Sequence, residues 1–182
     1  LFSGCGINNI PTYDEAAQAA WGQVINQYKR RADLIPNLVN TVKGYASHEE
    51  KVFVEVTNAR AKTGQMNIDA SSLNDPAMLA KFEEAQNQLS AALSKMMLVS
   101  ERYPELKASQ NFLQLQSQLE GAENRISVAR RDFIAAVQTY NTELRTYPGR
   151  LWHSVLYSDL KEKAQFTVPN VKEVEQAPEV SF

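Results

Sequence analysis

The sequence has little of the material from which metal and redox centres are built. Its 182 residues include a single cysteine and two histidines, with only seven glycines and seven prolines. One cysteine excludes a disulfide framework and any Cys-x-x-Cys zinc or redox site, and the scattered glycines form no phosphate-binding loop. The formal net charge is −2, so no overall positive field is present to hold nucleic acid. We therefore expect no cofactor, no metal ion and no nucleic-acid partner.

Long apolar runs are missing as well. No apolar stretch reaches the roughly 18 residues that a membrane-spanning helix needs, so none of these residues is expected to cross a bilayer. The chain has instead long stretches of Ala, Gln, Leu, Glu, Lys and Arg, which favour long helices over a turn-rich β architecture. Its length is that of a single domain and suffices for a sizeable core without disulfides or a structural metal.

The first third of the chain carries a helical pattern that passes through a proline. A Thr12-x-x-Glu15 capping box marks a helix start, and apolar residues then recur at alternating steps of three and four as far as Ala59. Pro36 lies inside this stripe, where a proline removes one backbone hydrogen bond. Because the stripe keeps its phase, we expect one long helix that is kinked just before Pro36 and ends near Gly64.

Two further helices are expected, each with its own start signal. Asp75 caps the second, with Pro76 at its first helical position, and Ser109 caps the third, whose heptad-like stripe runs to Tyr147. The sequence predicts an all-α fold: an antiparallel bundle of three long helices plus one or two short helices, with an extended C-terminal tail. We assign residues 1–11 to the membrane-proximal remnant of an anchor, residues 12–165 to the helical bundle and residues 166–182 to the tail, packed on the bundle.

The amino end is similar to the tail of a bacterial lipoprotein signal. Small residues precede Cys5 and apolar residues precede those, and in such a signal the cysteine thiol is acylated. Phe2 stands where leucine is usual, and the chain starts without Met, as a trimmed or processed product does. Cys5 is the candidate lipidation site. The alternatives are a stray thiol on a frayed end, or the outer edge of an uncleaved membrane helix.

Candidate catalytic chemistry is sparse. Neither histidine follows a glutamate at the spacing that a di-iron helix bundle requires. His48 and Glu49 begin like the His-Glu-x-x-His motif of zinc proteases, but Val52 stands where the second histidine is needed. A lone helical histidine beside a glutamate is more often solvated or capping than catalytic. We expect no enzyme, with a hydrolase using His48 and Glu49 as the alternative.

Polar residues near Pro36 and in the middle of the third helix predict a polar layer between the two helices. Carbonyl groups freed by Pro36 need donors, which neighbouring asparagines or an arginine can supply. We hypothesise that Asp33 pairs with Arg125 or Arg130, a contact that would fix the register of the helices. The alternative is that these positions are capped and solvated. The candidates for the network are Asp33, Asn37, Asn40, Glu123, Arg125 and Arg130.

The two basic clusters of the chain do not form an anion site. Residues 29–31 and residues 130–131 are each followed within two positions by an aspartate. This local neutralisation indicates solvated faces or structural ion pairs. Contact with acidic lipid head groups near the anchor is the alternative, although such contacts use longer clusters.

Several stretches spread over nearly the whole chain form one set of motifs: residues 30–39, 42–45, 48–49, 56–60, 103–108, 119–121, 123–126 and 129–132, and at the carboxyl end Ala177-Pro178 with Val180 and Phe182. Together they resemble the signature of the LemA family. Two places depart from the family pattern: Phe133-Ile134 stand where Tyr-Asn usually follows the Arg-Arg-Asp motif, and Ile7-Asn8 stand at the amino-terminal Tyr-Asn motif. The departures concern local contacts.

The resemblance implies a helical bundle tethered to a bacterial envelope by its amino-terminal segment, and it implies no enzyme. Our first hypothesis is a non-catalytic, membrane-anchored scaffold that docks envelope proteins along its exposed faces, on the periplasmic or extracytoplasmic side. A second is an adaptor for a membrane protease or for envelope quality control, with the tail at residues 178–182 as the docked element. The seam of the third helix also permits a homo-oligomer.

Overall fold

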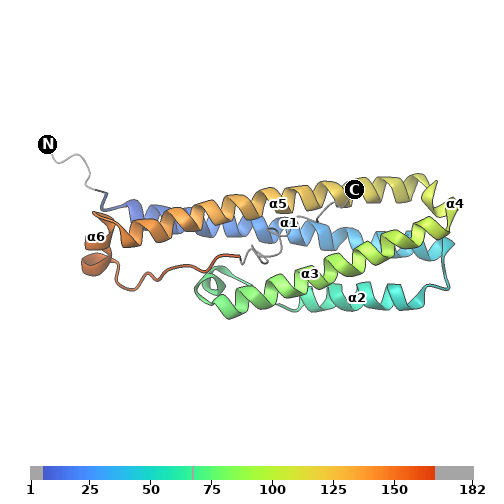
Figure 1. Ribbon diagram of the computed structural model, residues 1–182, viewed down its shortest axis with the longest axis horizontal. Coiled ribbons are helices and arrows are strands. Elements are labelled where there is room, and N and C mark those ends of the chain that lie inside the picture. The colour runs from blue at the N-terminus through green and yellow to red at the C-terminus, as the bar shows by residue number, and fades with distance from the viewer. Residues whose placement is uncertain (1–5, 67, 167–182) are drawn as a thin grey trace, which may run out of the picture.

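The protein is an elongated bundle of helices, described here by a computed structural model that covers residues 6–66 and 68–166. Two long helices, α1 (Asn9–Tyr45) and α5 (Gln110–Arg145), run antiparallel side by side along its whole length (Figure 1). A shorter antiparallel pair, α2 (Glu50–Gly64) and α3 (Pro76–Val99), packs against one half of the long pair. The other half is completed by α6 (Gly149–Leu156) and the segment after it.

Short elements connect the principal helices. They are the 3₁₀ turns η1 (Ala70–Asn74) and η2 (Ser100–Arg102) and the single-turn helix α4 (Pro104–Lys107). Within the described residues every regular element is helical. The predicted all-α class and antiparallel bundle are therefore confirmed.

The first of the three expected long helices is two helices, so that expectation is wrong in detail. The chain leaves α1 after Tyr45, turns through residues 46–49 and returns as α2, antiparallel to its own predecessor. Val42, Ala46 and Phe53 all enter the same core cluster. The helical spacing of apolar residues therefore continues unchanged across the turn. Periodicity alone thus did not reveal the turn.

The start of α1 also differs from the expectation. The helix begins at Asn9, before the expected capping box, and the Thr12 hydroxyl donates to the carbonyl of Asn8 at 2.7 Å. Thr12 therefore lies within the first turn and does not act as a cap. By contrast, Asp75 caps α3 as expected, since its carboxylate accepts from the backbone amides of Ala77 and Met78.

The core consists of clusters in sequence along the bundle axis. One joins all four principal helices around Leu38, Val56, Met96 and Phe112. The next is aromatic and places Trp21 within 5.1–5.8 Å of the rings of Phe82, Phe133 and Phe166. A smaller one, around Ile10 and Tyr140, packs beneath α6.

The segment after α6 returns along the bundle and is held by backbone hydrogen bonds. Asn141 on α5 bonds both backbone groups of Lys163, donating to its carbonyl and accepting from its amide at 2.9 Å each. The next residue, Ala164, donates to the carbonyl of Leu73 at 2.7 Å. Phe166 then enters the aromatic cluster. The remainder of the expected tail lies outside the described residues.

Candidate functional site

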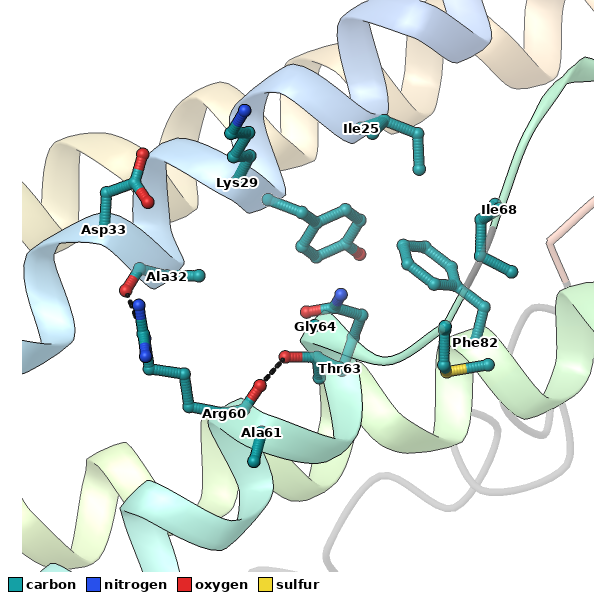
Figure 2. A pocket seen from close by; sticks show the side chains of 13 residues that line it. Ile25, Lys29, Ala32, Asp33, Arg60, Ala61, Thr63, Gly64, Ile68 and Phe82 are labelled. Carbon is teal, nitrogen blue, oxygen red and sulfur yellow. Dashed lines mark hydrogen bonds between the residues drawn. The ribbon is translucent and has the colours of Figure 1, made fainter.

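The carbonyl group that Pro36 frees is bound by an arginine from another helix. Pro36 lies inside α1 and has no amide hydrogen for the carbonyl of Ala32, four residues earlier. Arg60 on α2 fills that place, donating from Nε to the Ala32 oxygen at 3.0 Å (Figure 2). An arginine was one of the donors expected for this carbonyl. The contact joins α1 to α2 close to the proline.

Arg60 forms part of the wall of a groove between α1, α2 and the start of α3. The groove has a volume of about 400 Å³. The buried rings of Tyr28 and Phe82 line it. Lys29 and Asp33 line it from α1 (Figure 2). An apolar floor with a few charged groups around it is the general form of a site that binds a small molecule or a side chain of a partner.

Arg31 is the most deeply buried charged residue of the described chain, with 1% of its surface exposed. Its guanidinium reaches two other helices. On α3 it donates to Ser90 Oγ and to Gln86 Oε1, both at 2.7 Å, and on α5 it pairs with Glu123 at 2.6 Å. The guanidinium also lies 5.2 Å from the ring centre of Tyr28. This single side chain therefore fixes the relative positions of α1, α3 and α5.

Arg130 makes a second bridge, one step further along the bundle. From α5 it donates to the Tyr28 hydroxyl at 3.0 Å and to Glu83 Oε1 on α3 at 2.5 Å. Its guanidinium lies 4.0 Å from the ring centre of Phe166. Burial disfavours the charged form, but the hydrogen bonds to Tyr28 and Glu83 outweigh that effect and raise the pKa of Arg130. The Arg130 guanidinium therefore stays charged and joins α5 to α1 and α3.

Lys163 makes a third bridge, near α6. Its ammonium group pairs with Asp14 on α1 at 2.7 Å and lies 4.9 Å from the ring centre of Tyr140. Tyr140 donates its hydroxyl to the carbonyl of Lys161 at 3.0 Å. Burial raises the pKa of the Tyr140 phenol well above its ordinary value, and the nearby Asp14 carboxylate adds to the effect. The phenol therefore stays neutral and keeps its donor role.

The structure distributes the six predicted network residues differently from the expectation. Asp33, Asn37, Asn40 and Arg125 are exposed. Asp33 pairs with neither Arg125 nor Arg130 within the described part of the chain, because it lies roughly 200° around α1 from Arg31, which faces α5. Glu123 and Arg130 do join helices, but their partners are Arg31 and Glu83. A polar layer thus exists where it was expected, built largely from other residues.

The candidate hydrolase pair is not arranged as an acid–base couple. His48 is exposed in the turn between α1 and α2. The Glu49 carboxylate already has two partners: its Oε1 lies 3.0 Å from Arg102 Nη2 and accepts a hydrogen bond from the Tyr103 hydroxyl at 3.3 Å. Across residues 6–66 and 68–166, no three of His, Cys, Asp and Glu come together as a metal site would require. The geometry gives no support to the hydrolase alternative.

Two of the sequence-based predictions concern residues that lie outside the described part. Cys5 is one, and the tail at residues 178–182 is the other. Lipidation of Cys5 and docking of the tail therefore stay predictions. Among the helices that the structure describes, none is both long and apolar enough to cross a membrane.

Sequence reasoning did not single out three residues that the structure makes important: Arg31, Arg60 and Lys163. A signal was present for the first two. Arg31 lies three residues after Tyr28 on the apolar stripe of α1, and Arg60 lies four residues after Val56 on that of α2. A charged residue in phase with a buried stripe indicates a buried ion pair. Lys163 lies in an irregular segment, where no periodicity exists to mark it.

Comparison with known proteins connects this bundle to one family. Residues 20–182 match the model of the LemA family. The magnetosome protein MamQ 2 of Paramagnetospirillum magneticum is 24% identical over 175 residues, which cover 87% of this chain and 63% of that protein. The protein LemA of Metamycoplasma hominis is 24% identical over 119 residues, covering 65% of this chain and 50% of that protein. The chain thus spans less than two thirds of the length of these relatives.

Proposed function

The chain belongs to the LemA family, and from that premise we propose that it is a non-catalytic helical scaffold, anchored in a bacterial cell envelope, that docks other envelope proteins along its exposed helix faces. The partners are proteins of the same envelope, and the chain acts by holding them. Its activity is binding, without turnover of a substrate.

The observation that carries this proposal is the use to which the buried charges are put. Enzymes keep titratable groups with perturbed pKa values in a cavity, and these groups have hydrogen-bonding capacity left for the substrate. Here Arg31, Arg130 and Lys163 are each paired with a carboxylate from another part of the chain. Such pairs specify one arrangement of helices and leave the surface for recognition.

The rod-like shape supports the same proposal. The long helices α1 and α5 contain 37 and 36 residues, so each extends on the order of 55 Å at about 1.5 Å per residue. Their outward faces are polar along most of this length, as the exposed positions of the two helices show. A rigid surface of this length offers room for a standard protein–protein contact on more than one side.

We place the anchor at the amino end, at Cys5. The test is expression of the full-length gene in a bacterial envelope, as wild type and as Cys5→Ser, with a labelled fatty acid in the medium. We expect label and membrane recovery in the wild type and loss of both in Cys5→Ser. Membrane recovery without label in both forms would place the anchor in a preceding helix. Recovery of the wild type in the soluble fraction would contradict anchoring.

A further inference from the structure

The end of the bundle that carries α6 has half of the large exposed apolar side chains of the described residues. Ten large hydrophobic residues of the described chain are exposed, and five of them lie at the end formed by α6 and the start of the chain. Of the other five, Val128 lies in the middle of α5, whereas the rest lie close to the helix ends at the opposite end of the bundle (Figure 1): Tyr45, Val54, Leu98 and Leu113. Scattered apolar residues are normal on a protein surface, whereas a cluster indicates a contact. The cluster consists of Ile7, Tyr147, Leu151, Val155 and Leu156.

The geometry of α6 turns this cluster outward. Leu151 and Val155 are four residues apart and share one face of the helix, with 48% and 66% of their surfaces exposed. On the inner side, Trp152 packs against the core cluster of Ile10, Tyr140 and Leu144, and His153 Nε2 bonds with the carbonyl of Leu160 in the following segment at 2.8 Å. Gly149 is buried against Glu143 at the start of the helix. These contacts leave Leu151 and Val155 on the side of α6 that faces away from the core.

The described chain begins beside this face. A Cβ atom placed on Gly6 would lie 3.4 Å from Cγ of Pro148, the residue that precedes α6. The Asn9 side chain, in the first turn of α1, donates to Glu143 on α5 at 3.2 Å. Only three residues separate Cys5 from Asn9, a distance that a chain can span with at most roughly 14 Å. Any anchor at Cys5 thus holds the α6 end close to whatever it is anchored in.

We propose that the outward face of α6, with Tyr147 and Ile7, is a lipid-contact surface that seats this end of the bundle on the membrane. The proposal rests on the anchoring proposed above and adds the orientation of the bundle. Leu151 and Val155 enter the boundary between head groups and acyl chains, as the apolar face of an interfacial helix does. Tyr147 is exposed and of the amphipathic aromatic type that this boundary favours. Trp152 packs with part of its ring against the core cluster and leaves the rest beside Leu151 on the surface.

The surroundings of the face favour lipid over a protein partner. Arg150, at the first turn of α6, is exposed and lies within reach of head-group phosphates. The apolar area comprises few side chains on a helix of 8 residues, which is small for a stable protein interface. The short segment between an anchor at Cys5 and α1 keeps the α6 face at a high effective concentration near the bilayer. Even weak contact with lipid is then sufficient to seat this end of the bundle on the membrane.

The single cysteine of the chain allows a direct test. The full chain is coupled through Cys5 to vesicles of phosphatidylethanolamine and phosphatidylglycerol that contain a maleimide lipid. Fluorescence of Trp152 is then measured with and without a lipid that carries a quencher close to the head group. The chain has only two tryptophans, and Trp21 is 2% exposed in the core. The Trp152→Phe variant therefore gives the background from Trp21.

We expect quenching of Trp152 in the tethered wild type, and a loss of at least about half of that quenching in Leu151→Gln/Val155→Gln. The matched control, Val54→Gln/Leu98→Gln, removes equally exposed apolar residues from α2 and α3, and we expect it to quench as the wild type does. Circular dichroism of each variant establishes that the bundle is folded.

Three outcomes overturn the proposal. One is absence of quenching in the tethered wild type, and another is equal quenching in both double variants. The third is an untethered chain that sediments as a dimer and becomes monomeric in Leu151→Gln/Val155→Gln, which makes the face a contact between copies. Because the tether is supplied chemically, none of these results bears on whether Cys5 is acylated in cells, so the two proposals fail separately.

Discussion

Arg60 on α2 donates from Nε to the carbonyl of Ala32 at 3.0 Å, which is the group that Pro36 leaves without its helical partner. The proline therefore costs α1 one internal hydrogen bond and gives α2 a docking point. An unsatisfied carbonyl in this half-buried place would cost about 1–3 kcal/mol, so the contact is more than incidental. The relationship links the interior proline to the packing of the second helix pair.

The first prediction follows from that contact. Arg60→Ala is expected to lower the free energy of unfolding by about 1–2 kcal/mol in the wild type. In the Pro36→Ala background, residue 36 regains its amide and satisfies Ala32 itself, so the same change should cost clearly less. Urea unfolding of the four proteins measures the coupling, with Lys51→Ala as an exposed control on α2. Equal costs in both backgrounds would refute the link to Pro36.

The second prediction concerns the central bridge. Arg31→Ala removes the cation that holds Gln86, Ser90 and Glu123 together, and we expect a loss of about 3 kcal/mol. Arg30→Ala, at the exposed neighbouring position, is expected to change stability by less than about 0.5 kcal/mol. Thermal unfolding of both variants decides the matter. A similar melting temperature for the two would show that the Arg31 network contributes nothing.

The third prediction contrasts two carboxylates. Glu83 is largely buried and pairs with Arg130, so Glu83→Ala leaves a half-buried guanidinium with one partner fewer and should cost about 1–3 kcal/mol. Asp33 is exposed, so Asp33→Ala should leave the melting temperature unchanged. A large loss in Asp33→Ala would restore the pairing of Asp33 that the sequence suggested and the structure does not show.

The fourth prediction tests how α6 is attached to the bundle. A Cβ on Gly149 would lie 2.2 Å from the carbonyl oxygen of Glu143, so Gly149→Ala forces the backbone apart and should cost more than about 2 kcal/mol. At Gly22, inside α1, such a Cβ would meet no side chain and no backbone beyond its own turn of helix within 4 Å. Gly22→Ala should therefore stabilise the helix by about 0.5–1 kcal/mol. If both changes act alike in chemical denaturation, α6 is not held as described.

Sequence patterns were sufficient where a helix has a start signal and a long stripe of its own. Asp75 as the cap and Pro76 at the first helical position located α3. The alternating stripe of residues 112–144 located α5, which begins directly after Ser109 as expected, although the Ser109 side chain makes no capping hydrogen bond. They failed at residues 46–49, where the chain reverses without a proline and without a change of phase. The available signals were Gly44 and the polar run that begins at Ser47, which resemble a helix end followed by a new start.

The candidate site was harder to predict than the fold, because pairing depends on which helices become neighbours. If residues 12–64 formed one continuous helix, Arg60 would lie far from Ala32 along the helix axis. The single-helix interpretation therefore could not predict the contact between these two residues. The same interpretation hid the groove that these helices enclose. Asp33 was favoured by its closeness to Pro36 in sequence, whereas Arg31, two residues earlier, faces the interior.

The most direct test of the scaffold proposal is capture of a partner in the native envelope. The full-length protein is crosslinked gently in cells, as wild type and as Cys5→Ser, and the attached proteins are identified by mass spectrometry. We predict a reproducible envelope protein on the wild type that is lost or strongly reduced in Cys5→Ser, with both forms present at equal abundance. The absence of any specific partner from both samples would contradict the account.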